Sequence, residues 1–310
     1  MRDAFFESLA ELAARDERVW ALTGDLGIGL FDPVAEAAPG RVMNLGIAEQ
    51  ALVGVAAGLS YAGKLPFAYS IAPFVTSRPH DQVRVDVAMA AANVKLVGVG
   101  GGMSYGYLGP THHAIEDLAL MRSMPNMTVL TPGDPEEARR ATLAAAAIDG
   151  PVYLRLGKNG EPRLLDEIAP VGRANVVREG ADVTLASTGA ILAETLSAAD
   201  LLAADGIDAM VLHYGTLKPF DGDALADAAA ITGALVTVEE HSVNGGLGSA
   251  AAETLAERGA GATLRRIGLQ DEFAFAVGSR EHLLRRYGLA AADVAAAARE
   301  LVRPTAAVSS

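Results

Sequence analysis

The chain alternates short apolar runs with longer segments of helical periodicity. In the first half, apolar runs predict strands at 19–23, 66–70, 94–99, 127–131 and 152–156. Helical patterns lie before and between them, at 2–15, 46–62, 74–91, 115–123 and 135–148. Short apolar strands separated by helices indicate βαβ units, a parallel sheet and helices on both of its faces. This pattern restricts the fold to the α/β class.

The alternation is interrupted once and then resumes. Residues 157–180 are richer in proline, glycine and charge than the rest of the chain. A second set of predicted strands follows at 183–187, 209–213, 235–239 and 263–267, with helices at 191–204, 222–229, 245–258 and 290–302. We therefore predict two consecutive three-layer α/β domains with mostly parallel sheets. The first covers 1–165 and the second 180–303, with a linker at 166–179 and a tail at 304–310.

Charge and composition restrict the classes of function. The formal net charge is −13 and no segment is rich in Lys and Arg, which argues against a nucleic-acid-binding face. The chain has no cysteine, which excludes disulfides and cysteine metal sites. Acidic residues near the start do not fit a signal peptide, and the apolar runs are too short to span a bilayer. We expect a cytoplasmic protein that binds neither nucleic acid nor membrane.

The most apolar predicted helix begins at an acid, Glu49. After Gln50 no charged residue appears before Lys64, and a helix that is apolar on every face is a buried helix. We therefore expect the Glu49 carboxylate to be partly buried. Burial favours the neutral acid, whereas a helix N-terminus favours the anion. On this segment alone, Glu49 is either an ordinary first-turn acid or a functional carboxylate.

A glycine-rich loop follows the predicted strand at 94–99. It contains glycine at 100, 101 and 102 and leads to His112 and His113. No helix follows at once and no Lys-Ser or Lys-Thr pair is present, so a phosphate-binding P-loop is not indicated. The loop does place both histidines at the carboxyl end of a strand, where open α/β sheets bind ligands. They are candidates for proton transfer or substrate contact, or one is solvated and the other structural.

Other polar residues lie at or near predicted strands. Asp25 follows the strand at 19–23 and is either a turn former or a site carboxylate. Arg155 lies within the apolar strand at 152–156, where a charge needs a partner such as an anionic ligand. In the second half, the segment 237–248 contains glycines between a strand and a helix, for which we favour a packing role.

Four segments together resemble the transketolase family of thiamine diphosphate enzymes. The first two read Asn-Leu-Gly-Ile-Ala-Glu-Gln at 44–50 and Gly-Pro-Thr-His-His at 109–113, and the others lie at 212–219 and 238–248. Their order and spacing agree with the family. More narrowly, residues 1–303 resemble the C-terminal, or β, subunit of a split transketolase, which consists of a pyrimidine-binding domain and the family's C-terminal domain.

The resemblance implies a role for each candidate residue. Glu49 hydrogen-bonds the aminopyrimidine ring of thiamine diphosphate and exchanges a proton with it, while Phe74 stacks on the same ring. His112 contacts the substrate, and Arg155 resembles an arginine that grips a sugar phosphate. The implied assignments are Glu49 and His112 as catalytic residues, Glu49, Phe74, Asp25 and Gln50 as cofactor contacts, and His112, His113 and Arg155 as substrate contacts.

The motif with which the family binds the diphosphate and a divalent metal is missing. That motif reads Gly-Asp-Gly with a later Asn, and the three Gly-Asp pairs here, at 24–25, 133–134 and 222–223, are followed by Leu, Pro and Ala instead of Gly. The resemblance therefore implies that this chain supplies no metal ligand. A separate N-terminal-type subunit would hold most of the diphosphate and the Mg²⁺ (or Ca²⁺), in an α2β2 assembly, and cofactor sites between chains are common.

Two departures from the family concern substrate recognition. Leu108 stands where transketolases carry an aspartate that hydrogen-bonds a sugar hydroxyl, and the glycines at 100–102 replace a region with another histidine. Loss of a side chain that hydrogen-bonds the substrate changes substrate specificity strongly.

We expect a β subunit that moves a two-carbon ketol unit between a ketose and an aldose, and we expect these sugars to be phosphorylated. One alternative is a thiamine diphosphate enzyme that decarboxylates 2-oxo acids, either deoxyxylulose-phosphate-synthase-like or the β subunit of a 2-oxo-acid dehydrogenase. The other is a non-catalytic regulatory subunit.

Overall fold

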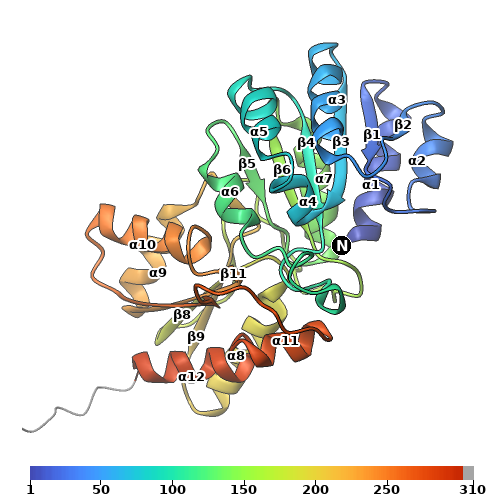
Figure 1. The fold of residues 1–310 in the computed structure, drawn as a ribbon. Coiled ribbons are helices and arrows are strands. Elements are labelled where there is room, and N and C mark those ends of the chain that lie inside the picture. Colours follow the sequence, from blue (N-terminus) through green and yellow to red (C-terminus); the bar gives the residue numbers. More distant parts are fainter. Residues whose placement is uncertain (303–310) are drawn as a thin grey trace, which may run out of the picture.

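The computed structural model describes residues 1–302, which form two sheets (Figure 1). The first consists of β1 (Val19–Thr23), β2 (Val42–Asn44), β3 (Leu65–Ile71), β4 (Lys95–Val99), β5 (Thr128–Leu130), β6 (Val152–Leu156) and β10 (Thr216–Lys218), in the spatial order β10-β5-β6-β4-β3-β1-β2. The second consists of β7 (Asn175–Arg178), β8 (Val183–Thr188), β9 (Ala209–His213), β11 (Ala234–Ser242) and β12 (Thr263–Leu269), in the order β12-β11-β8-β9-β7. Only the edge strands β10 and β7 are antiparallel to their neighbours. Two α/β domains with mostly parallel sheets are thus confirmed.

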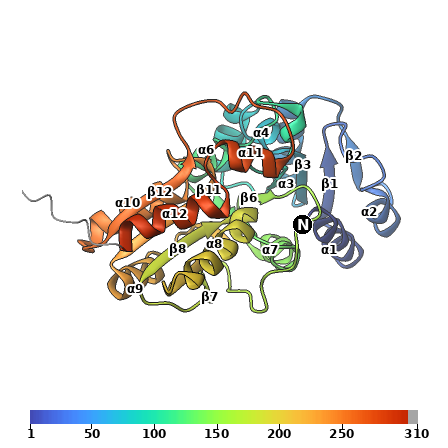
Figure 2. The ribbon, with the colours of Figure 1, turned by 90° about the horizontal axis from the view of Figure 1, so that it is seen from below.

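Helices cover both faces of the first sheet. On one face lie α1 (Arg2–Arg15), α2 (Asp32–Ala37) and α7 (Pro135–Ala147). On the other lie α3 (Glu49–Tyr61), α4 (Ala72–Thr76), α5 (His80–Gln82), the π-helix η1 (Val83–Met89) and α6 (Asp117–Ser123). Figure 2 shows α1 and α7 on one side of this sheet and α4 and α6 on the other.

The second sheet is also covered on both faces. One face packs against α8 (Leu192–Ala204), α11 (Arg280–Arg286) and α12 (Ala291–Val302), and the other against α9 (Gly222–Thr232) and α10 (Leu247–Arg258). The apolar core beneath α9 and α10 continues into the core beneath α3, so that Leu52 and Leu247 belong to one cluster. The two domains are therefore packed against each other.

The domain boundary is less simple than the predicted linker. Residues 175–178, which we assigned to the linker, form β7 and pair with β9 at the edge of the second sheet. Strand β10 lies beyond the linker in sequence, yet it pairs with β5 in the first sheet. Both strands are short antiparallel edges with few apolar residues, so neither has the pattern by which the central strands were recognised.

The predicted helix at 74–91 is divided: α4 ends at Thr76, and α5 begins at His80 and continues directly into the π-helix η1. Pro79 lies between α4 and α5, and proline interrupts a helix because it lacks the amide donor and clashes with the preceding turn.

Helix α3 is buried on one face rather than on every face. Leu52, Val53 and Ala56 are fully buried, whereas Ala51 and Val55 are exposed. The prediction of burial is therefore correct for Glu49, which is 5% exposed, and wrong for the opposite face of the helix.

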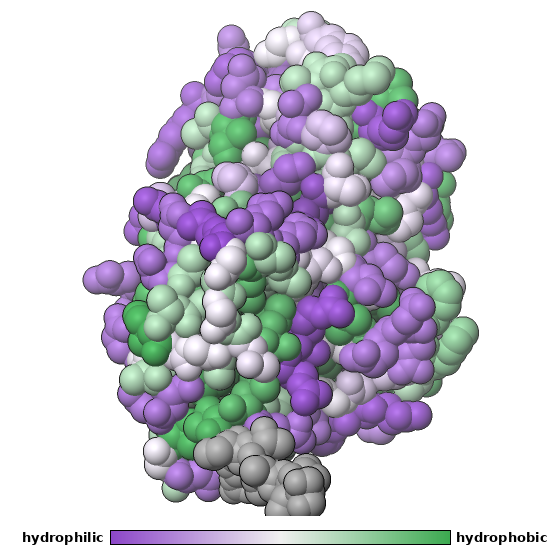
Figure 3. All heavy atoms as spheres, turned by 90° about the vertical axis from the view of Figure 1, so that its left-hand side faces the viewer, coloured by the Kyte–Doolittle hydropathy of each residue, from purple (hydrophilic) through white to green (hydrophobic). Residues whose placement is uncertain are grey.

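No helix within residues 1–302 combines the length and apolar character needed to cross a membrane. On the face that carries α9 and α10, hydrophobic residues lie in groups separated by hydrophilic ones (Figure 3).

A buried lysine at the start of β4 predicts a pH-dependent stability. The Nζ atom of Lys95 donates to the carbonyl oxygens of Ile148 and Gly150, each at 2.7 Å, and the two N–H groups of a neutral amine match these two acceptors. Burial lowers the pKa of Lys95 from 10.5 to about 7. Between these values the unfolded chain binds more protons than the folded chain, so stability increases as the pH rises from 7 to 9, by up to about 1.4 kcal/mol per pH unit.

Urea unfolding at pH 7, 8 and 9 measures this increase. The Lys95→Met variant is expected to lack the Lys95 contribution and to have a flatter profile. Equal slopes in the two proteins would contradict the assignment to Lys95.

Candidate active site

The Glu49 carboxylate is buried and paired with a cation. Both of its oxygens accept hydrogen bonds from Nη1 of Arg78, at 3.1 Å and 3.0 Å. The hydroxyl of Ser70 in β3 lies 3.5 Å from Oε1. An ion pair of this kind offsets part of the cost of removing the carboxylate from water.

Phe74 and His112 lie beside this ion pair. The guanidinium carbon of Arg78 lies 3.5 Å from the centroid of the Phe74 ring, which is a stacked cation–π geometry. The His112 ring meets the Phe74 ring edge-on, with 4.9 Å between centroids. The structure thus brings together three of the predicted site residues, Glu49, Phe74 and His112, which are far apart in sequence. Arg78 was not predicted, because a single Arg in a helical segment has no sequence signal that separates it from a solvated charge.

The surroundings of His112 favour its neutral form. Burial is the main cause that lowers the pKa of His112, and the positive charge of Arg78 adds to it. The Thr111 hydroxyl lies 2.9 Å from Nδ1, within hydrogen-bonding distance. A neutral imidazole held in this way can donate or accept one proton at its other nitrogen.

Asp25 and Gln50 lie at the rim of the site. The backbone of Asp25 has a positive φ of 58°, and its side chain accepts a hydrogen bond from Asn44 at 3.0 Å. The adjacent Gly24 lies close to Glu49, since a Cβ there would be 3.8 Å from Oε1. Gln50 is exposed and its Nε2 lies 3.4 Å from the carbonyl oxygen of Arg78. Their predicted contact with a cofactor stays a prediction.

The two other predicted substrate contacts are both buried. His113 is 2% exposed, so the structure does not place it at an open surface, and its predicted contact with a substrate stays a prediction. Arg155 is 5% exposed and forms an ion pair with Asp117 at 2.8 Å. Its Nη2 also donates to the carbonyl oxygens of Ala114 and Glu240. The predicted partner of the buried Arg155 charge is therefore the carboxylate of Asp117, within the same chain. The hydrogen bond from Arg155 to Glu240 also connects the first domain to β11 of the second.

The glycines at 100–102 allow close approach to side chains of the protein. A Cβ on Gly100 would lie 2.1 Å from the Tyr105 ring, and a Cβ on Gly102 would lie 2.4 Å from the carboxyl carbon of Glu240. Both have positive φ, which a larger residue adopts only with strain. These glycines therefore shape the loop that leads to His112.

The glycines of segment 237–248 likewise have a packing role. Glu239 accepts hydrogen bonds from the amides of Leu247 and Gly248 at the start of α10. A Cβ on Gly246 would lie 2.0 Å from the Glu239 carboxylate.

A cavity of ≈ 350 Å³ lies at the carboxyl ends of the first-sheet strands, and none of the predicted site residues is in its lining. Its lining includes Ser104, Tyr107, Lys158 and Arg280. The Nζ atom of Lys158 lies 5.2 Å from the centroid of the Tyr105 ring, which is itself 6.5 Å from the His112 ring.

Lys158 is the cation of this cavity that can meet an anion. Arg280 already donates three hydrogen bonds to Glu240, and Glu161 accepts a hydrogen bond from the Met1 amino group. Lys158 lies in the loop after β6 and was not predicted as the anion contact. Our prediction chose Arg155, the charged residue inside the strand.

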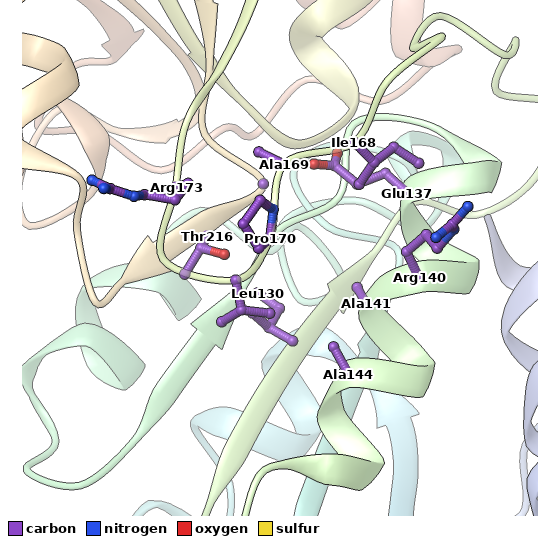
Figure 4. Close-up of a pocket in the computed structure, with 12 residues that line it drawn as sticks. Leu130, Glu137, Arg140, Ala141, Ala144, Ile168, Ala169, Pro170, Arg173 and Thr216 are labelled. Carbon is purple, nitrogen blue, oxygen red and sulfur yellow. The ribbon is translucent and has the colours of Figure 1, made fainter.

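A second cavity, of ≈ 330 Å³, lies away from these residues (Figure 4). It is formed by α7 and the segment 168–173, with Glu137, Arg140 and Arg173 among its lining. None of the predicted site residues reaches it. Within residues 1–302 no group of three or more His, Asp or Glu is arranged to hold a metal ion.

Glu49 and Phe74 present the two features that the pyrimidine end of thiamine diphosphate requires, a carboxylate and an aromatic face. A flat, hydrogen-bond-donating group, the Arg78 guanidinium, stacks on Phe74 and donates to Glu49 there. An aminopyrimidine is also flat and donates from its edge. Glu49 and Phe74 are thus suited to hold that ring.

Comparison with known proteins agrees with this geometry. Residues 1–161 match the transketolase pyrimidine-binding domain, and residues 172–294 match the transketolase C-terminal domain. The chain is 43% identical over 305 residues to the 6-deoxy-6-sulfo-D-fructose transketolase subunit SqwH of Clostridium sp. (strain MSTE9), covering 97% of this chain and 94% of that one.

Two further proteins extend the comparison. The chain is 39% identical over 305 residues to 1-deoxy-D-xylulose-5-phosphate synthase of Thermomicrobium roseum, covering 95% of this chain and 47% of that protein. A solved split-gene transketolase, described as an inactive β4 tetramer, matches with a TM-score of 0.90 and 42% identity, covering 97% of this chain and 99% of that one. The chain therefore belongs to the transketolase family.

Proposed function

We propose that this chain is the β-type subunit of a two-component transketolase that moves a two-carbon ketol unit from a ketose to an aldose. The observation that carries the proposal is the convergence of Glu49, Phe74 and His112 at one point on the carboxyl edge of the first sheet. The family membership and the similarity to transketolase subunits over the whole chain support it.

Each side chain has a separate task in this reaction. When bound, thiamine diphosphate would supply the nucleophilic carbon for the transfer. Phe74 would hold the flat pyrimidine by stacking, and Glu49 would hydrogen-bond its edge and exchange a proton there. His112, with a lowered pKa, transfers a proton to or from a substrate oxygen and orients it.

Lys158 is proposed to bind the anionic end of the sugar. It lines the cavity of ≈ 350 Å³, and its Nζ lies 5.2 Å from the Tyr105 ring, which is 6.5 Å from the His112 ring. An ammonium group forms charge-assisted hydrogen bonds to phosphate or sulfonate oxygens. The names of both sequence relatives contain a sugar with such a group, a sulfo group in one and a 5-phosphate in the other. Lys158 thus takes the role that we predicted for Arg155.

A partner subunit is proposed to hold the diphosphate and the metal. Exposed apolar side chains lie close in sequence to site residues, with Ile28 at 97% exposure after Asp25 and Ile47 at 76% before Glu49. Tyr107, at 76% exposure, lines the cavity that contains Lys158. Exposed apolar groups of this kind are typical of surfaces that a partner covers. The solved relative, a β4 tetramer described as inactive, supports the need for a second kind of chain. We propose an α2β2 assembly with Mg²⁺ (or Ca²⁺) bound mainly by the α chain.

The experiment is reconstitution with an N-terminal-type subunit that carries Gly-Asp-Gly. The pair, supplied with thiamine diphosphate and Mg²⁺, is expected to move two carbons from a phosphorylated or sulfonated ketose to an aldose, and either chain alone is expected to be inactive. Release of CO₂ from pyruvate without ketol transfer would favour the 2-oxo-acid reaction, for which the similarity to the synthase is the observation. Absence of both activities would favour a regulatory subunit.

Replacing Lys158 tests the anion contact. In the reconstituted enzyme, Lys158→Met is expected to raise KM for the anionic ketose about 10- to 100-fold, since it removes a charged hydrogen bond of about 1.5–3 kcal/mol. A ketose without the anionic group serves as the control, because its KM is expected to be the same in both proteins. An unchanged KM for the anionic sugar would show that Lys158 does not contact it.

A further inference from the structure

The Arg78 side chain lies where the aminopyrimidine would bind. It makes the same two contacts that the proposed function assigns to that ring. Its guanidinium lies 3.5 Å from the centroid of Phe74 and donates to both carboxylate oxygens of Glu49.

The two groups cannot occupy this position together. A separation of 3.5 Å is direct contact between stacked flat groups, so no space remains between the guanidinium and the Phe74 ring. The Glu49 carboxylate is likewise engaged at both oxygens by one nitrogen of Arg78.

We propose that Arg78 is a gating residue of the cofactor site, which keeps Glu49 paired and must leave Phe74 before the pyrimidine binds. This inference rests on the proposed function. It identifies Arg78 as a residue that competes with the cofactor for Glu49 and Phe74.

The position of Arg78 permits this movement. Its side chain is 44% exposed, so it can rotate into solvent without unpacking a core. Arg78 lies just before Pro79, in the turn between α4 and α5, and so belongs to neither helix. The Gln50 side chain contacts the backbone carbonyl of Arg78 at 3.4 Å, a contact that does not depend on the guanidinium.

Competition of this kind lowers the apparent affinity for the cofactor. The apparent Kd is the intrinsic Kd divided by the fraction of molecules with Arg78 displaced. At a partly exposed site, a charge-assisted contact combined with a cation–π stack favours the paired conformer of Arg78 over the displaced conformer by about tenfold. Removal of the guanidinium is therefore expected to tighten cofactor binding about tenfold.

The test is calorimetric titration of thiamine diphosphate into the reconstituted αβ enzyme in Mg²⁺. Arg78→Ala is expected to lower the Kd about tenfold relative to the natural chain, and Arg78→Lys, which keeps the charge without the planar stack, about threefold. Arg84→Ala is the matched control, because it removes the same charge from an exposed position on η1 and is expected to leave the Kd unchanged. Thermal unfolding confirms that each variant is folded.

The outcomes separate the inference from the proposed function. If the natural enzyme binds thiamine diphosphate and Arg78→Ala binds it equally or more weakly, the gating role is wrong while the proposed function stands. If the natural enzyme does not bind thiamine diphosphate at all, both are wrong. A tighter Kd in Arg84→Ala of the same size would show a general charge effect and would also overturn the gating role.

Discussion

Glu49→Gln is expected to lower the two-carbon transfer rate of the reconstituted enzyme by about 10³-fold, within the range that a positioned acid or base contributes. Glutamine has nearly the same shape as glutamate and can still hydrogen-bond Arg78, but it cannot exchange a proton with the pyrimidine edge. Steady-state kinetics of the pair at saturating thiamine diphosphate measures the loss.

The control for this change is an acid with no part in the site. Glu36 lies exposed on α2, and Glu36→Gln is expected to retain full activity. Both variants are expected to unfold near the temperature of the natural chain. Full activity of Glu49→Gln in the presence of the partner would contradict the assigned role of Glu49.

Arg155→Met is expected to lower the free energy of unfolding by about 3–5 kcal/mol, the usual effect of removing one partner of a buried ion pair. Asp117 would then be buried with only the hydrogen bond from the Tyr153 hydroxyl, which is 2.6 Å long. The contacts of Arg155 to the carbonyl oxygens of Ala114 and Glu240 would be lost as well. Urea unfolding of the isolated chain measures the effect.

A second variant separates stability from substrate binding. Arg155→Met combined with Asp117→Asn is expected to recover part of the lost stability, because the uncompensated charge is removed. If Arg155 gripped a sugar phosphate instead, the single variant would unfold like the natural chain and would raise KM for the anionic sugar. That pattern would restore our first assignment of Arg155 and remove the reason for choosing Lys158.

The layout of the fold and the centre of the site were predictable from sequence. Central parallel strands carry nearly continuous apolar runs, which is why β1, β6 and β9 were located with their observed bounds. Glu49, Phe74 and His112 each lie near the carboxyl end of a strand or at the start of a helix of the first domain. Parallel topology brings such ends to one edge of the sheet, so their proximity follows from the chain order.

The remaining site residues depend on side-chain contacts that periodicity does not encode. Arg155 and Lys158 are three positions apart, and only the presence of Asp117 behind β6 decides which of them is free to meet a ligand. His113 and His112 are adjacent, and one is buried while the other meets Phe74. Arg78 lies in the turn between α4 and α5, and its contact with Glu49 joins residues 29 positions apart.

The most direct test of the shared cofactor site is calorimetric titration of thiamine diphosphate, with Mg²⁺, into this chain alone, the N-terminal-type partner alone and the two together. Glu49 and Phe74 hold only the pyrimidine end, so tight binding is predicted for the pair and not for this chain by itself. Tight binding by the isolated chain would contradict a cofactor site divided between two subunits.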